Sequence, residues 1–238
     1  MITKTCREVA AAAKASGGDL DNLRLVTAVS KARQLNVPKD AISSAVDRGI
    51  NGKDVSNAEV VRYDGTVKSG SATVCVVIMG LTDNKNRTSA TIKAAFRKHG
   101  TLLPTNKNAF MFSETATVTL ILPESGSRET LEDAVMESAL EGGAEDVVFE
   151  EGDWGGEDNE GGGEVKVKAK CTMSRGDLGG VVESLRGNTL LEGVDLEPAF
   201  GLVPTNEVEV DDGDGLETFL DLMDENEDVT DTYHNAAG

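Results

Sequence analysis

Apolar residues recur every three or four positions along the first fifty residues, which is the spacing of an amphipathic helix. Glycines at 17 and 18 permit the positive φ of a helix stop, and Pro38 suits the first turn of another helix. The pattern predicts three short helices over 1–15, about 19–35 and 38–48. With such brief connections, they are expected to form a small bundle.

Helical periodicity ends near residue 51, and 52–57 is interpreted as a linker. Two strands are predicted at 59–63 and 71–79, joined by a Gly-containing turn over 64–70. The second is almost entirely β-branched or small and apolar, as is typical of a central strand buried on both faces. A helix follows over 85–99, and a further short strand over 110–112.

Strand-helix-strand then occurs twice, which is the ferredoxin-like pattern. The predicted elements are strand 116–122, helix 128–141, strand 145–150, strand 164–170, helix 176–186 and strand 194–200. The Gly-rich acidic stretch 151–163 is interpreted as a long hairpin loop. A last strand (207–210), helix (about 215–223) and strand (229–233) have no partner of their own, so we expect them to complete the sheet begun within 59–113.

The predicted fold is therefore α+β. A three-helix domain occupies 1–56, a discontinuous α+β domain occupies 57–114 and 203–238, and a ferredoxin-like domain over 115–202 is inserted into the second.

Composition narrows the class of protein. No apolar run reaches the roughly 18 residues of a membrane span, and no signal-peptide pattern opens the chain. Aromatic content of 4% argues against a base-stacking platform. Cys6, Cys75 and Cys171 are widely separated, which favours a reducing compartment.

The net charge of −19 is unevenly distributed. Residues 1–109 carry 17 Lys and Arg against 9 Asp and Glu, whereas 110–238 carry 6 against 33. A basic first half (+8) beside an acidic remainder (−27) is a hint of nucleic-acid contact. The alternative is that both sets of charges merely cover solvated faces.

Catalytic patterns are absent from the sequence. Its two histidines have no Cys or His at metal-ligand spacing, and no G-x-S-x-G elbow occurs. We therefore predict no enzymatic activity, no metal, no cofactor and no small-molecule substrate.

The segment 83–88 combines polar and basic residues on what should be an exposed turn before the helix at 85–99. Asn86 or Thr88 is a candidate cap, and free N–H groups with two cations suit an anion such as phosphate. The plain alternative is a helix cap with incidental charge. The candidate binding residues are Asp83, Asn84, Lys85, Asn86, Arg87 and Thr88, then Lys93, Arg97 and Lys98 on the helix, and Lys31, Arg33, Lys39 and Arg48 on the bundle.

"DNKNRT", "AAFRKHGTLLPT" and "AFMFS" within 81–112 resemble the central signature of the YebC family. The segment "KARQLNVPKDAISSAVDRG" (31–49) is similar to its helix-turn-helix-like segment, and "ALEGGAEDV", "LVPTNEVEV" and "DVTDTYHN" resemble later blocks in the same order. The resemblance implies a helical domain, an α+β domain and an inserted ferredoxin-like domain. It also implies a non-enzymatic role in transcription or translation, with the family's polar motif at 83–88 and its basic helix at Lys93, Arg97 and Lys98.

The sequence departs from the family pattern at two places. The family usually begins with a basic segment containing a G-H-S-K-W-like run, and this sequence starts after it, through truncation or loss. Because each lost phosphate contact lowers the affinity, we expect the binding strength inferred from this chain to be a lower bound. The family's Gly-rich Y-E-G-x-G-P-G-G turn is reduced to Tyr63-Asp64-Gly65 followed by Ser69-Gly70, so no function of its glycines is carried over.

Three hypotheses follow. The first is a translational activator that contacts the ribosome or mRNA through residues 1–109; the second is a DNA-binding transcriptional regulator; the third is an acidic adaptor for a basic protein. The basic half favours the first two, and the lack of a clear base-reading helix favours RNA. We expect a monomer with no membrane partner, located in the mitochondrion, with a plastid or the bacterial cytoplasm as alternatives.

Overall fold

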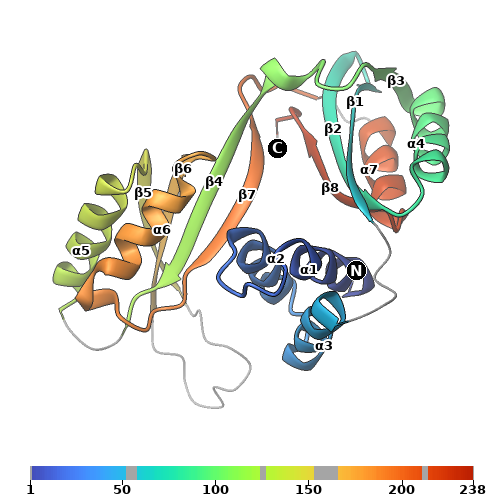
Figure 1. The fold of residues 1–238 in the computed structure, drawn as a ribbon. Coiled ribbons are helices and arrows are strands. Elements are labelled where there is room, and N and C mark those ends of the chain that lie inside the picture. The colour runs from blue at the N-terminus through green and yellow to red at the C-terminus, as the bar shows by residue number, and fades with distance from the viewer. Residues whose placement is uncertain (1, 52–57, 124–126, 153–165, 211–213, 238) are drawn as a thin grey trace. The chain divides into compact units, whose positions relative to one another are not determined.

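The computed structural model describes residues 2–51, 58–123, 127–152, 166–210 and 214–237 (Figure 1). The chain divides into two compact units. The first unit comprises 1–20, 31–113 and 202–238, and the second comprises 21–30 and 114–201. The predicted linker over 52–57 and most of the predicted hairpin loop, 153–163, lie outside the described residues.

Three helices open the chain, as the periodicity predicts: α1 (Ile2–Ala15), α2 (Leu23–Gln34) and α3 (Lys39–Asn51). Small apolar residues let α1 and α3 pack closely, because Val9 and Ala13 of α1 and Ala45 of α3 are fully buried. The three helices are confirmed. Their association in one bundle and a separate domain over 1–56 stay predictions.

The first unit contains a four-stranded sheet in the order β3-β1-β2-β8, in which every neighbouring pair is antiparallel. Its strands are β1 (Glu59–Ser69), β2 (Ala72–Thr82), β3 (Gly100–Leu103) and β8 (Val229–His234). The expectation that the last strand completes this sheet is confirmed, since β8 pairs with β2.

Three local predictions were wrong. Residues 64–69 continue β1 instead of forming a turn, and only Gly70, at φ 57°, adopts the left-handed conformation at the hairpin. The predicted strand at 110–112 is a short 3-10 helix, Ala109–Met111, where β4 begins. Residues 207–210 form only an isolated bridge between Val208 and Ala236.

Two helices, α4 (Lys85–His99) and α7 (Asp214–Glu225), lie on the same side of this sheet (Figure 1). Their apolar residues pack against alternate residues of the strands. Phe96 of α4 and Phe219 of α7 are fully buried, with ring centroids 5.0 Å apart. This core fixes α4 on the sheet and leaves its opposite side exposed.

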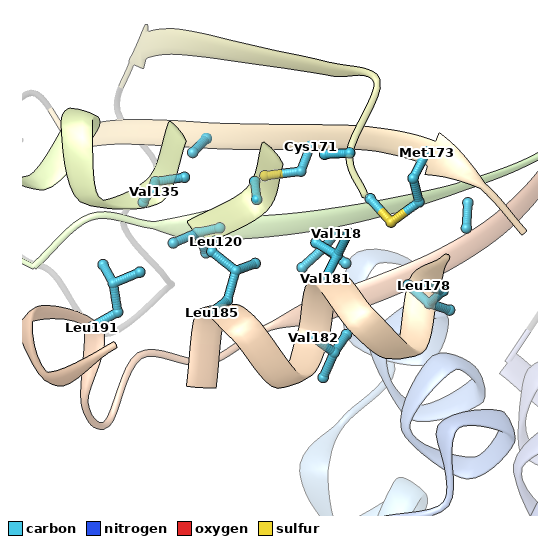
Figure 2. Packing of buried hydrophobic residues seen from close by; sticks show 14 of the residues in the cluster. Val118, Leu120, Val135, Cys171, Met173, Leu178, Val181, Val182, Leu185 and Leu191 are labelled. Carbon is cyan, nitrogen blue, oxygen red and sulfur yellow. The ribbon is translucent and has the colours of Figure 1, made fainter. Parts of the chain in front are cut away.

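The second unit has the sheet order β5-β6-β4-β7, which is the ferredoxin-like arrangement. Its elements are β4 (Phe112–Ile121), α5 (Arg128–Glu141), β5 (Asp146–Gly152), β6 (Lys166–Ser174), α6 (Leu178–Gly187), a 3-10 turn (Thr189–Leu191) and β7 (Glu197–Pro204). Figure 2 shows Leu178, Val181 and Leu185 of α6 directed toward residues of β4 and β6, all within one buried cluster. The repeated strand-helix-strand pattern is confirmed.

Candidate nucleic-acid interface

Helix α4 begins at the polar segment 83–88. The side chain of Asn84 accepts a hydrogen bond from the backbone N–H of Arg87 (3.1 Å), which satisfies one of the free donors of the first turn. The prediction that Asn86 or Thr88 caps this helix was therefore wrong. Asn86 is exposed, whereas Thr88 is buried and does not face solvent.

The buried carboxylate of Asp228 organises this turn. Thr88 Oγ1 donates to Asp228 Oδ2 (2.8 Å), and Arg87 Nη2 donates to Asp228 Oδ2 (3.0 Å) and to Asp83 Oδ1 (2.9 Å). Arg7 of α1 adds a third contact, with its Nη2 3.4 Å from Asp228 Oδ1. Asp228 thus ties the start of α4 to α1 and to the beginning of β8.

The pKa of Asp228 lies below its ordinary value. Burial alone would raise the pKa, but hydrogen bonds from Thr88 and Arg87, together with the charge of Arg87, stabilise the carboxylate more strongly. A depressed pKa means that this carboxylate stabilises the folded protein above its unfolded pKa of about 3.9 and loses that effect as the pH falls.

We therefore expect the wild-type protein to lose stability below about pH 4 more steeply than Asp228→Asn, which has no carboxylate at this position. Urea unfolding at a series of pH values measures the difference. Parallel curves for the two proteins across the acid range would show that Asp228 does not contribute in this way.

The pocket beside this turn is not an anion cradle. It measures about 550 Å³, and its lining includes Arg7 and Arg87 but also four acids, Asp83, Glu225, Glu227 and Asp228. Both arginines already contact Asp228. Lys85, on the same turn, forms an ion pair with Glu59. The cations predicted to meet phosphate at 83–88 are thus engaged with carboxylates of the chain itself.

The other predicted cations of α4 behave differently. Lys93, Arg97 and Lys98 are exposed, and within the described residues none of them forms an ion pair. The neighbouring exposed positions on the helix are small, Ala90 and Thr91 before Lys93 and Ala94 after it. No Asp or Glu occurs anywhere from Asn84 to Ser113, in a chain that has 42 of them.

The predicted cations of the bundle also divide into two groups. Lys31 is held by Asp231 of β8 (2.8 Å) and Glu8 of α1 (3.1 Å). Burial alone would lower the pKa of Lys31, but the two carboxylates outweigh it and raise the pKa. Arg33, Lys39 and Arg48 are exposed on α2 and α3. Lys31 is therefore structural, whereas the other three belong to the surface.

Sequence reasoning missed Asp228, Arg7 and a buried network around Asp64. Asp64 is fully buried and pairs with Arg62 Nε (2.8 Å), while the backbone N–H of Asn108 donates to Asp64 Oδ2 (3.1 Å). The resemblance of "DVTDTYHN" pointed to the block that contains Asp228, but no local feature marked which of its acids is buried.

Two further findings concern the described residues only. No group of three or more His, Cys, Asp or Glu is placed to hold a metal ion. None of the helices is both long enough and apolar enough to cross a membrane.

Two family models together match almost the whole chain. The family model for the "TACO1/YebC protein N-terminal domain" matches residues 1–52, and that for the "TACO1/YebC second and third domain" matches residues 58–236. The chain belongs to the TACO1/YebC family. The segment 83–88 and helix α4 both lie in the part matched by the second TACO1/YebC model.

Bacterial members of the TACO1/YebC family resemble the chain along its length. A protein of Hahella chejuensis is 34% identical, over 99% of this chain and 86% of its own. Proteins of Burkholderia lata (36%; 98% and 88%) and Clostridium perfringens (35%; 97% and 85%) are similar. Each is named a probable transcriptional regulatory protein.

A solved structure agrees with the fold. The crystal structure of a conserved hypothetical protein from Aquifex aeolicus superposes with a TM-score of 0.64 at 26% identity, covering 99% of this chain and 88% of that one. The relatives named above are bacterial, which fits the bacterial alternative and gives no support to the mitochondrial prediction.

Proposed function

We propose that this chain is a non-enzymatic regulator of gene expression that binds nucleic acid through the exposed side of α4. The observation that carries the proposal is the grouping of Lys93, Arg97 and Lys98 on one helix inside an acid-free segment of a strongly acidic protein. Exposed cations without internal partners are the groups that neutralise phosphates and release counterions.

The surface of α4 suits a sugar-phosphate backbone better than base edges. The small side chains of Ala90, Thr91 and Ala94 allow a backbone to approach the helix closely. Long polar side chains that read bases in a major groove, such as Asn, Gln and Arg, are few on this face. These features favour structured RNA, as found in a ribosome or an mRNA, over sequence-selective DNA, and translational activation is the role we propose.

A DNA-binding transcriptional regulator is the second candidate. It is favoured by one observation, the name "probable transcriptional regulatory protein" carried by bacterial relatives about one-third identical to this chain. Both candidates use the same cations, so they differ in which nucleic acid binds.

The triple variant Lys93→Ala/Arg97→Ala/Lys98→Ala is expected to bind nucleic acid about 100-fold more weakly near physiological salt. Its plot of log K against log salt should be shallower by about 2 to 3, since three phosphate contacts are lost. Fluorescence anisotropy with a structured RNA hairpin and a DNA duplex over a salt series measures both quantities, and ribosome co-sedimentation tests the physiological target.

A matched control removes the same charge from the second unit. Arg128→Ala/Lys170→Ala/Arg186→Ala changes three exposed cations, and we expect its affinity to stay within about twofold of wild type. Equal losses in the two triple variants would contradict a site on α4. Tight binding to one DNA sequence without ribosome association would favour the transcriptional role.

A further inference from the structure

Phe110 is the one exposed aromatic residue within the described part of the chain. Its exposed fraction is 73%. The remaining described aromatic residues are buried or half-buried, at Tyr63, Phe96, Phe112, Phe149, Phe200, Phe219 and Tyr233. A phenylalanine in water gives up the stabilisation that burial would provide, so this ring contributes little to the fold.

The backbone on both sides of Phe110 is held firmly. Asn108 is 3% exposed, and its Nδ2 donates to the carbonyl oxygens of Gly65 (2.7 Å) and Val76 (3.1 Å) in the sheet. On the other side, Thr205 Oγ1 donates to the Phe110 carbonyl (3.3 Å) and Thr205 N–H donates to the Met111 carbonyl (2.9 Å). The ring is therefore presented from a fixed backbone, which lowers the entropy that binding would cost.

The charge around this turn suits a polyanion. Phe110 lies in the acid-free segment from Asn84 to Ser113 that also contains α4, and Lys107 is exposed three residues before it. Asn106 is also exposed and adds a polar side chain to the turn. The exposed residues that precede the ring along the chain are polar, basic or small, at Thr105, Asn106, Lys107 and Ala109. A protein-binding hot spot instead has several large apolar side chains around its anchor.

We infer that Phe110 stacks on an unpaired base of a single-stranded stretch of nucleic acid, with Lys107 beside the adjoining phosphate. Proteins that bind single strands combine an aromatic face for the base with cations for the backbone, and this turn supplies both. The inference rests on the proposed function and extends it, because α4 contacts backbone only and gives no preference for single strands. The low aromatic content of the sequence excludes an extended stacking platform but not one stacking residue.

Phe110→Ala tests the inference with a single-stranded RNA of about 12 nucleotides and the duplex of the same sequence. We expect the affinity for the single strand to fall at least about fivefold with an unchanged salt slope, and the affinity for the duplex to stay within about twofold. Phe110→Tyr should retain single-strand affinity, whereas Phe110→Leu should not. Because the ring is exposed, the thermal unfolding midpoint should not change, which separates lost stacking from lost folding.

A spectroscopic signal tests stacking directly. In a Trp154→Phe background, Phe110→Trp should show fluorescence quenching by the single strand and little by the duplex.

Equal single-strand affinities for wild type and Phe110→Ala overturn the inference while leaving the proposed function intact. A wild-type protein that binds neither probe overturns both, and loss of a protein partner in Phe110→Ala without loss of RNA binding assigns the ring to a protein contact instead.

Discussion

Asp228→Ala is expected to lower the free energy of unfolding by about 3 kcal/mol. The substitution removes the charged acceptor of the buried Thr88 hydroxyl, which keeps Thr82 Oγ1 (2.7 Å) within reach, and it removes the common partner of Arg7 and Arg87. Breaking a buried charge pair costs more than the pair contributes, because the remaining groups lose their partner without regaining full hydration. Both arginines are partly exposed, so water recovers some of the loss and the expected effect lies at the lower end for such sites.

Chemical denaturation of the two proteins measures this difference. Asp221→Ala, on the exposed side of α7, removes one carboxylate from the same unit and should change stability by no more than about 0.5 kcal/mol. Asp228→Asn should lie between them, since an amide oxygen can still accept from Thr88. A loss below about 1 kcal/mol for Asp228→Ala would show that Asp228 does not hold the start of α4.

Gly65→Ala is expected to cost about 3 kcal/mol for a different reason. A Cβ at this position would lie 2.2 Å from Cε1 of Phe96, whose ring is almost fully buried against Phe219. The ring cannot move aside without disturbing the core between α4 and the sheet. Gly65 thus provides space for α4, which assigns a packing role to a glycine left unexplained by the sequence.

A second substitution tests this explanation. Phe96→Leu alone should destabilise the protein, but in combination with Gly65→Ala it frees space, so the two changes should cost less together than their sum. Gly187→Ala, which has no atom within 4 Å of the added Cβ, serves as the neutral control. Strictly additive losses in the double variant would contradict a clash with Phe96.

Sequence patterns were most accurate where the determinants are local. The bounds of α4 match the prediction, because apolar spacing and Gly100 mark both its face and its end. The order of elements in the second unit was also predicted correctly, but β6 and β7 each end four residues later than predicted, at Ser174 and Pro204. The turn predicted at 64–70 failed because Asp64 and Gly65 have turn-like chemistry, but the structure neutralises Asp64 with Arg62 and uses Gly65 for packing.

For the candidate site, the sequence identified the sign of the charge but not its partners. Exposure of Lys93, Arg97 and Lys98 follows from helical periodicity, which is a property of neighbouring residues. Pairing depends on residues far along the chain: Arg87 and Asp228 are 141 positions apart. No pattern within 83–88 could show that its two cations are already neutralised.

The placement of β8 has a consequence for how the protein is made. The first sheet needs a strand that is translated after the whole second unit, and Asp228 immediately precedes that strand. Since units fold in the order in which they leave the ribosome, the ferredoxin-like unit can fold while the edge of β2 that pairs with β8 is still open. Until Asp228 is translated, Thr88 and Arg87 at the start of α4 lack their carboxylate partner. A nascent chain therefore contains the basic helix well before the contacts that fix its first turn can form.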